Sequence, residues 1–276
     1  MYYEKIQLKT VYDFLGKNDC NPTVTVYLPN NLWEMNRGHL KKQCMIVCPG
    51  GGYDNCSQRE AEVIGTEFLN EGYNVFVINY SGRGHSFPTQ ICEMAAVLDL
   101  IHNNAEAWNC DVEKIAAIGF SAGAHLVAHY SNRFDCAEVR SFFPNSYPLN
   151  AAILSYPVIT AIPELCNRDS IVRVSGSSEI TDEVVNNFSC ELMVTEKTPP
   201  TFIWHTVADH MVPVENSLLY ASALQKNKVP FELQIYPYGL HGLATVDERT
   251  NNELDEKVKL AADWIPSVKK WLKVIL

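Results

Sequence analysis

Gly119-Phe120-Ser121-Ala122-Gly123 is the stretch of this sequence that decides the fold. A short, mostly apolar segment, residues 114–118, leads into it, and a helix-like segment, residues 124–130, follows it. Strand, tight turn and helix in this order form a nucleophile elbow, in which a serine on a strained turn exposes its hydroxyl at the edge of a sheet. The flanking glycines are required because a Cβ atom there would collide where strand and helix approach each other. We therefore expect Ser121 to be a nucleophile.

Short apolar segments alternate with helical patterns along the chain. Residues 23–28 alternate polar and apolar side chains, as a half-exposed edge strand does. Continuous apolar runs indicate strands buried on both faces, and they occur at residues 45–48, 75–78, 115–118, 151–154 and 202–204. Helices are predicted at residues 57–71, 89–107, 122–131, 215–227 and 255–276. This alternation predicts the α/β class, with a mostly parallel, doubly wound sheet, helices on both faces and ligands at the carboxyl ends of the strands.

The chain of 276 residues is predicted to form a single domain spanning residues 1–276. Residues 157–200 are too many for a simple loop and predict a short, lid-like insertion over the site. This insertion carries ten charged side chains, so it lacks the broad apolar face with which an interfacial lipase lid meets lipid. We expect a soluble substrate with a short acyl group.

Composition excludes several classes of partner. The net charge is −10 and lysine and arginine are scattered, so neither nucleic acid nor a membrane surface is an expected partner. No apolar run approaches the roughly 20 residues that cross a bilayer, and no secretory leader pattern opens the sequence. Nine cysteines, an odd number without a C-x-x-C pair, predict reduced thiols and a cytoplasmic location. A homo-oligomer is compatible with the sequence.

A serine hydroxyl is a weak nucleophile until a base removes its proton, so partners for Ser121 are needed further along the chain. In folds with this elbow the order is serine, then an acid, then histidine, each on a loop after a core strand. Asp209 follows the strand predicted at residues 201–205, and His241 follows that at residues 231–236. We expect His241 to be the general base and Asp209 to orient it and to stabilise the imidazolium. His210 is a weaker candidate for the base.

The run Pro49-Gly50-Gly51-Gly52-Tyr53 follows an early strand and predicts an oxyanion hole. Consecutive glycines let the backbone aim its amides inward, and we expect the amides of Gly51, Gly52 and Ala122 to be the donors. A phosphate-binding loop is the alternative, but the run has neither the Lys-Ser/Thr ending nor the spacing of a dinucleotide motif. Tyr53, beside the glycines, is expected to contact substrate and to limit the depth of the acyl pocket.

Together these motifs resemble an α/β-hydrolase of the acetyl esterase type, in the branch of feruloyl and acetyl-xylan esterase-like proteins often labelled "xylan esterase" or "sugar hydrolase". The matching segments are residues 49–53, 119–126, 198–202 leading to Asp209, and 241–243. Pro49 differs from the histidine of hormone-sensitive-lipase-like relatives, which places the chain in the neighbouring branch. The resemblance implies the α/β-hydrolase fold and cofactor-independent hydrolysis of a small-molecule or oligosaccharide ester by a serine carboxylesterase, through an acyl-enzyme.

Two other functions are alternatives. A kynurenine formamidase-like amidohydrolase uses a similar Ser-Ala-Gly-Ala-His run, here residues 121–125. A catalytically silent binding protein of this fold is the second alternative. A metal enzyme is disfavoured. His125 and His129 have the i, i+4 spacing of zinc ligands, but Leu126 stands where a zinc protease has its glutamate, and the sequence suggests no third ligand. No metal or cofactor is therefore expected.

Overall fold

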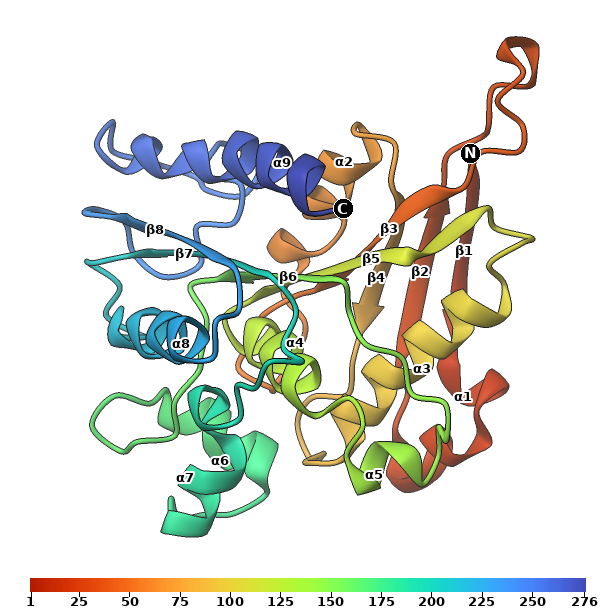
Figure 1. Cartoon of the computed structure of the whole chain (residues 1–276). Helices are drawn as coiled ribbons and strands as arrows, with labels where there is room; N and C mark the ends of the chain where they lie inside the picture. Colours follow the sequence, from red (N-terminus) through yellow and green to blue (C-terminus); the bar gives the residue numbers. More distant parts are fainter.

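The computed structural model describes residues 1–276, except for the side chains of residues 17 and 18. Eight strands form one sheet in the order β1-β2-β4-β3-β5-β6-β7-β8 (Figure 1). β2 is antiparallel to both of its neighbours, and the remaining pairs are parallel. The strands are β1 (Tyr2–Gln7), β2 (Thr23–Leu28), β3 (Lys42–Cys48), β4 (Asn74–Asn79), β5 (Cys110–Phe120), β6 (Ala151–Ser155), β7 (Thr201–Thr206) and β8 (Phe231–Tyr236). The predicted mostly parallel α/β sheet is confirmed.

Helices cover both faces of the sheet, with α2 and α9 on one face and α3, α4 and α8 on the other (Figure 1). These five are α2 (Glu62–Leu69), α3 (Thr89–Asn103), α4 (Ala122–Arg133), α8 (Glu215–Lys226) and α9 (Trp264–Ile275). The remaining helices are α1 (Leu8–Val11), α5 (Ala137–Arg140), α6 (Arg168–Ser175) and α7 (Asp182–Phe188). The last two lie within the predicted insertion, so that segment is folded rather than an irregular loop.

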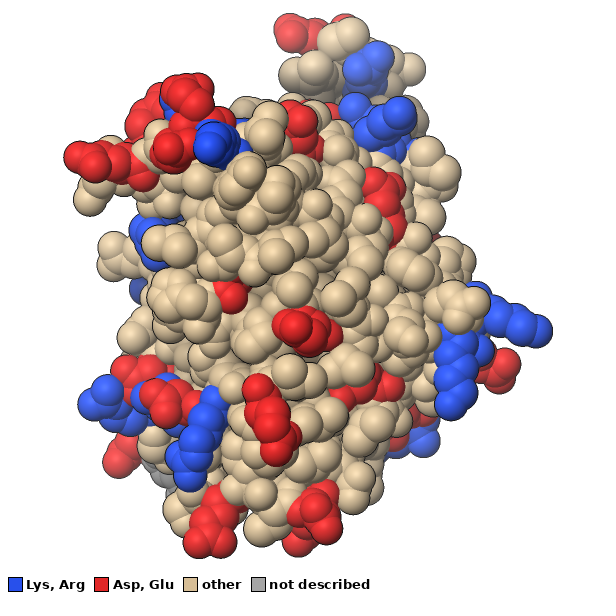
Figure 2. Space-filling view, turned by 90° about the vertical axis from the view of Figure 1, so that its left-hand side faces the viewer, with Lys and Arg blue, Asp and Glu red and all other residues tan. Residues whose placement is uncertain are grey.

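The surface shown in Figure 2 is largely uncharged in its centre, and its lysine and arginine side chains lie apart, with acidic side chains among them. This face therefore presents no basic patch. Within the part of the chain that the structure describes, no helix combines the length and the apolar character needed to cross a membrane. All nine cysteines are free thiols, and six of them are buried, at Cys20, Cys44, Cys48, Cys92, Cys110 and Cys190.

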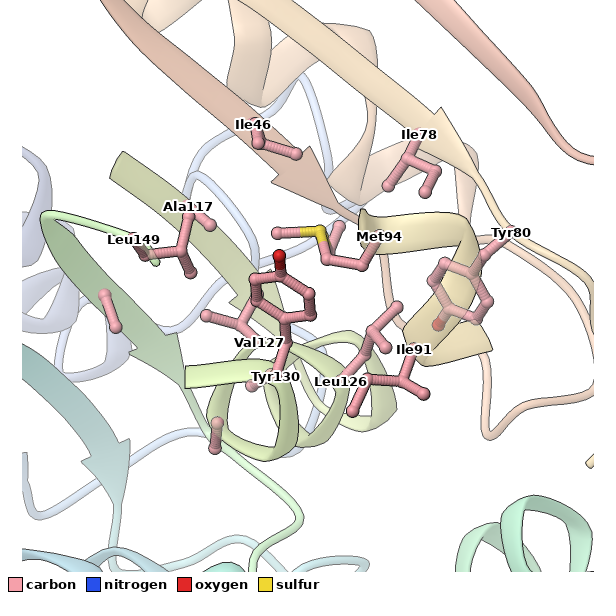
Figure 3. Close-up of a cluster of buried hydrophobic side chains, with 14 of the residues drawn as sticks. Ile46, Ile78, Tyr80, Ile91, Met94, Ala117, Leu126, Val127, Tyr130 and Leu149 are labelled. Atoms are coloured by element: carbon pink, nitrogen blue, oxygen red, sulfur yellow. The ribbon is translucent and has the colours of Figure 1, made fainter. Parts of the chain in front are cut away.

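The core consists of two apolar layers, one on each face of the sheet. Strand β3 contributes to both, because Ile46 packs in the layer beneath α3 and α4 whereas Val47 packs in the layer beneath α2 and α9. Figure 3 shows part of the first layer, where Ile46 lies near Met94 of α3 and Tyr130 of α4. Successive side chains of a strand point to opposite faces, so a strand covered on both must be apolar throughout. This explains the continuous apolar runs in the sequence.

Three predicted elements differ from the structure. Residues 23–28 are not an edge strand, because β1, which the sequence pattern did not predict, pairs with β2 and covers that edge. The predicted helix at residues 57–71 is interrupted at Ala61, whose φ of −103° and ψ of −107° are not helical. It forms the 3₁₀ helix η3 (Gln58–Glu60) followed by α2. The predicted helix at residues 255–276 likewise begins as a 3₁₀ helix, η5 (Val258–Asp263), before α9.

Candidate active site

Ser121 lies on the sharp turn between β5 and α4, and its backbone has φ of 53° and ψ of −117°. A non-glycine residue with positive φ is strained, and here tight packing imposes the strain. A Cβ atom on Gly119 would lie 2.4 Å from the carbonyl oxygen of Gly123, and one on Gly123 would lie 2.2 Å from that of Cys48. Both glycines are thus fixed by the close approach of strand and helix. The turn leaves Ser121 at the wall of a pocket.

The structure brings Ser121, His241 and Asp209 together from the loops after β5, β8 and β7. Nε2 of His241 lies 2.8 Å from Oγ of Ser121, and Nδ1 lies 2.6 Å from Oδ2 of Asp209. An ionised carboxylate can only accept hydrogen bonds, so Nδ1 carries the proton and Nε2 of the neutral ring is free to accept one from the serine. Gly242, at φ 80°, gives the histidine loop its turn.

Asp209 is held as an anion by a full set of donors. Its Oδ1 accepts hydrogen bonds from the amides of Met211 at 2.9 Å and Val212 at 3.0 Å. Burial acts to raise the pKa of Asp209, but hydrogen bonds from His205 and His241 outweigh it and hold that pKa well below the usual range of an aspartate. The carboxylate of Asp209 is therefore ionised at neutral pH.

His205, which the sequence analysis missed, also contacts Asp209. It lies on β7 and is fully buried, with Nε2 3.2 Å from Oδ2 of Asp209 and 3.0 Å from the carbonyl oxygen of Val212. Its Nδ1 lies 2.8 Å from Oγ of Ser217. Since both neighbours of Nε2 are acceptors, Nε2 carries the proton and Nδ1 accepts from the serine. A buried histidine four residues before the acid was the available signal in the sequence.

The glycine loop after β3 turns through residues with positive φ. Gly51 has φ of 124° and Gly52 has φ of 65°, both in the region that favours glycine. A Cβ on Gly51 would lie 2.1 Å from the carbonyl oxygen of Asn55. Among the described residues, the amides of Gly51, Gly52 and Ala122 donate to no protein acceptor. Gly51 and Gly52 line the same pocket as Ser121, so their amides are available beside it.

Tyr53 does not contact this pocket, and the expectation that its side chain binds substrate is wrong. The residue has φ of 57°, and the ring is 0% exposed. Its hydroxyl lies 2.9 Å from Nδ1 of His125, whose Nε2 lies 2.9 Å from the carbonyl oxygen of Phe188. Tyr53 and His125 thus link the glycine loop to the insertion. Searched over the described residues, the chain has no cluster of His, Cys, Asp or Glu side chains arranged to hold a metal ion.

The pocket beside Ser121 has a volume of about 420 Å³, and most of the residues that line it are of polar or charged types. Helix α6 of the insertion forms one wall, and Arg173 from this helix donates a hydrogen bond of 3.1 Å to the carbonyl oxygen of Gly52. The lining residues outside the triad and glycine loop are Asn55, Ser57, Arg59, Glu60, Asn167, Asp169, Ser170, Arg173, Met211 and Gly242. Arg59 also borders a second pocket, of about 650 Å³, between α2 and the edge of the sheet. The two pockets thus lie on either side of Arg59.

Comparison with known proteins gives two curated relatives that are named for xylan degradation. The endo-1,4-β-xylanase B of Butyrivibrio fibrisolvens is 37% identical over 232 residues, which are 80% of this chain and 36% of the relative. The acetylxylan esterase of Xylanibacter ruminicola is 27% identical over 204 residues, which are 72% of this chain and 41% of the relative. The chain thus spans about two fifths of the length of these curated relatives.

Two solved structures match almost the whole chain. The acetyl ester-xyloside bifunctional hydrolase of Caldicellulosiruptor lactoaceticus is 32% identical, with a TM-score of 0.80 and 96% of each chain covered. A carboxylesterase of Lactobacillus plantarum is 28% identical, with a TM-score of 0.83, 99% of this chain covered and 98% of that one. A family model described as BD-FAE matches residues 25–224. The chain belongs to the BD-FAE family of α/β-hydrolases, and the family and fold predicted from its motifs are confirmed.

Proposed function

We propose that this carboxylic ester hydrolase is a serine carboxylesterase that removes short acyl groups, foremost acetyl, from carbohydrate esters through an acyl-enzyme. The observation that carries the proposal is the unbroken hydrogen-bonded chain from Ser121 through His241 to Asp209, at 2.8 Å and 2.6 Å, beside unoccupied backbone amides. A nucleophile, a base with a fixed tautomer and a set of oxyanion donors are the parts that acyl transfer requires.

Each residue has a defined step in this reaction. Oγ of Ser121 attacks the ester carbonyl carbon while Nε2 of His241 takes its proton, and the carbonyl oxygen becomes an oxyanion. The amides of Gly51, Gly52 and Ala122 stabilise that charge, and Asp209 stabilises the imidazolium. His241 then gives the proton to the departing alcohol oxygen. Water then attacks the acyl-enzyme while His241 takes one of its protons. His241 returns that proton to Oγ of Ser121 as the acid is released.

The polar character of the pocket favours a sugar as the alcohol. Asn167 at the N-cap of α6 and Ser170 and Arg173 on that helix offer hydrogen-bonding groups to hydroxyls. The second pocket beyond Arg59 gives room for further sugar units. Two relatives and one solved neighbour carry names that refer to xylan, xyloside or acetyl esters. The charged insertion offers no apolar path for a long acyl chain.

A fluorophosphonate probe and a substrate panel test the proposal. The probe should label the wild-type protein and the Ser131→Ala control, whose serine lies on α4 away from the pocket, but not Ser121→Ala. Across p-nitrophenyl esters of two to twelve carbons, kcat/KM should be highest for acetate or propionate, and acetylated xylo-oligosaccharides should release acetate. A maximum at eight carbons or longer would refute the short-acyl substrate while leaving the serine mechanism standing. Labelling of Ser121→Ala would refute the mechanism.

A further inference from the structure

Glu60 is a buried carboxylate at the wall of the catalytic pocket and has no place in the triad or the oxyanion hole. It is the last residue of η3 and is 4% exposed. Each of its oxygens has one partner. Oε2 accepts a hydrogen bond of 2.9 Å from the amide of Gly50, and Oε1 accepts one of 2.6 Å from the hydroxyl of Tyr156. The two partners belong to different parts of the site.

Gly50 is the first glycine of the loop that carries the proposed oxyanion donors. A Cβ atom on Gly50 would lie 2.7 Å from Oε2 of Glu60 and 2.8 Å from the carbonyl oxygen of Phe120. The carboxylate thus lies so close to the backbone that a residue with a Cβ atom does not fit at position 50 without a shift. Because Gly50 is adjacent to Gly51, holding its amide fixes the point from which the donor loop turns.

Tyr156 lies on the other side of the carboxylate, directly after β6, and contacts the histidine loop twice. Its hydroxyl accepts a hydrogen bond of 3.1 Å from the amide of Ala244, three residues after His241. Its ring meets that of His241 edge to face, with centroids 5.0 Å apart and an interplanar angle of 69°. The phenol therefore restrains both the backbone of the loop and the plane of the imidazole.

We propose that Glu60 is a positioning residue that holds the oxyanion loop through Gly50 and the His241 loop through Tyr156. Its charge also favours the imidazolium formed during catalysis. This rests on the proposed function. The burial of the carboxylate argues for such a role, because no lysine or arginine forms an ion pair with it among the described residues. A buried, unpaired charge costs free energy, whereas an apolar side chain would pack there without that cost.

The electrostatic part of the role follows from what surrounds Glu60. Burial raises the pKa of Glu60, and hydrogen bonds from Tyr156 and Gly50, then the positive charges of His241 and Arg59, oppose the rise. By reciprocity, the anion favours a protonated His241. The groups that face His241 are Asp209 from the loop after β7, Ser121 from the elbow, Tyr156 after β6, and Glu60 and Arg59 from η3. Asp209 and Glu60 are the two acids among them.

The test compares Glu60→Gln with Glu62→Gln, an exposed glutamate two residues along the chain whose carboxylate accepts from Tyr27 instead. The rate of fluorophosphonate labelling of Ser121 is measured against pH, together with kcat and KM for p-nitrophenyl acetate. Glu60→Gln should lower the labelling rate and kcat roughly 10- to 100-fold, with KM changed much less, because the reacting groups are misplaced. The acidic limb of its pH profile should move to lower pH. Glu62→Gln should match wild type in each measurement.

Tyr156→Phe is the second variant and removes only the hydroxyl that joins Glu60 to Ala244. It should lower kcat by a similar factor. The double variant Glu60→Gln/Tyr156→Phe should have a kcat no lower than that of the poorer single variant, because both substitutions break the same connection. An unshifted acidic limb in Glu60→Gln would overturn the electrostatic part of the role, and kcat of both single variants within twofold of wild type would overturn the positioning part. Absence of labelling in the wild-type protein would instead overturn the proposed function, so the two failures are distinguishable.

Discussion

Nε2 of His205 lies 3.2 Å from Oδ2 of Asp209, the same carboxylate oxygen that accepts from His241. One buried oxygen thus receives two imidazole donors. The hydrogen bond from His205 fixes the carboxylate of Asp209 from the side of β7. The carboxylate is therefore oriented toward His241 before any substrate binds. Preorganisation of this kind reduces the reorganisation needed during the reaction.

Replacing His205 should therefore weaken catalysis without removing any reacting group. We expect His205→Ala to lower kcat roughly tenfold through a less well oriented Asp209. His205→Gln should recover part of the loss, because its side-chain amide can donate in place of Nε2. His210→Ala is the matched control, because His210 is exposed and next to Asp209 in sequence. Steady-state kinetics measure both variants. A defect in His210→Ala equal to that in His205→Ala would mean that the loss is not specific to the contact between His205 and Asp209.

Removal of the nucleophile or the base should have a far larger effect. Ser121→Ala and His241→Ala should each lower kcat by about 10⁶, by analogy with a serine protease triad. Asp209→Asn should cost about 10⁴, since the imidazole is misoriented but still present. The assay is ester hydrolysis under single-turnover and steady-state conditions, with Ser131→Ala as control. Ser121→Ala with more than a tenth of wild-type activity would exclude the mechanism.

The pH dependence should follow one ionisation. His241 accepts the serine proton only when neutral, so kcat/KM should rise with pH on the acidic side and then level off. The pKa of Asp209 is held well below the usual range, so this acid stays ionised across the rise and adds no second step. A plot of log kcat/KM against pH should have a slope of one on its acidic limb. A slope of two would mean that a second group titrates there as well, and Glu60, whose pKa is raised by burial, is the first to test.

The oxyanion loop can be tested by adding one methyl group. In Gly51→Ala the Cβ would meet the carbonyl oxygen of Asn55 at 2.1 Å, so the loop must move and its amides with it. We expect kcat to fall about 10²- to 10³-fold, the cost of losing one oxyanion donor. Gly72→Ala is the control, because Gly72 also has positive φ, 91°, but no atom lies within 4 Å of the added Cβ. Equal losses in both variants would trace the effect to backbone strain.

The sequence predicted those parts of the site that are encoded by local motifs. Ser121, Asp209 and His241 each follow a strand that the sequence predicted, so the topology alone brings them to one edge of the sheet. Their catalytic roles, the single domain and the cytoplasmic location stay predictions.

What the sequence did not predict depends on contacts between distant segments. Strand β1 carries no apolar run and exists because β2 offers it an edge to pair with. Tyr53 appeared to belong to the pocket because it follows the glycines, but its positive φ turns the ring toward His125. The sequence placed Glu60 in a predicted helix at residues 57–71. In the structure this helix is broken at Ala61, and the carboxylate of Glu60 faces inward, toward Gly50.

Helix α6 and its N-cap Asn167 supply four residues to the wall of the pocket, yet none of the three triad residues lies in the segment that contains them. Substitutions in the first turn of this helix can therefore alter which ester is accepted while bond cleavage proceeds as before. Arg173 is the exception, since its hydrogen bond to Gly52 reaches the oxyanion loop itself. For protein engineering, the helix is a site at which new selectivity can be introduced by a library that varies Asn167, Asp169 and Ser170 and retains Arg173.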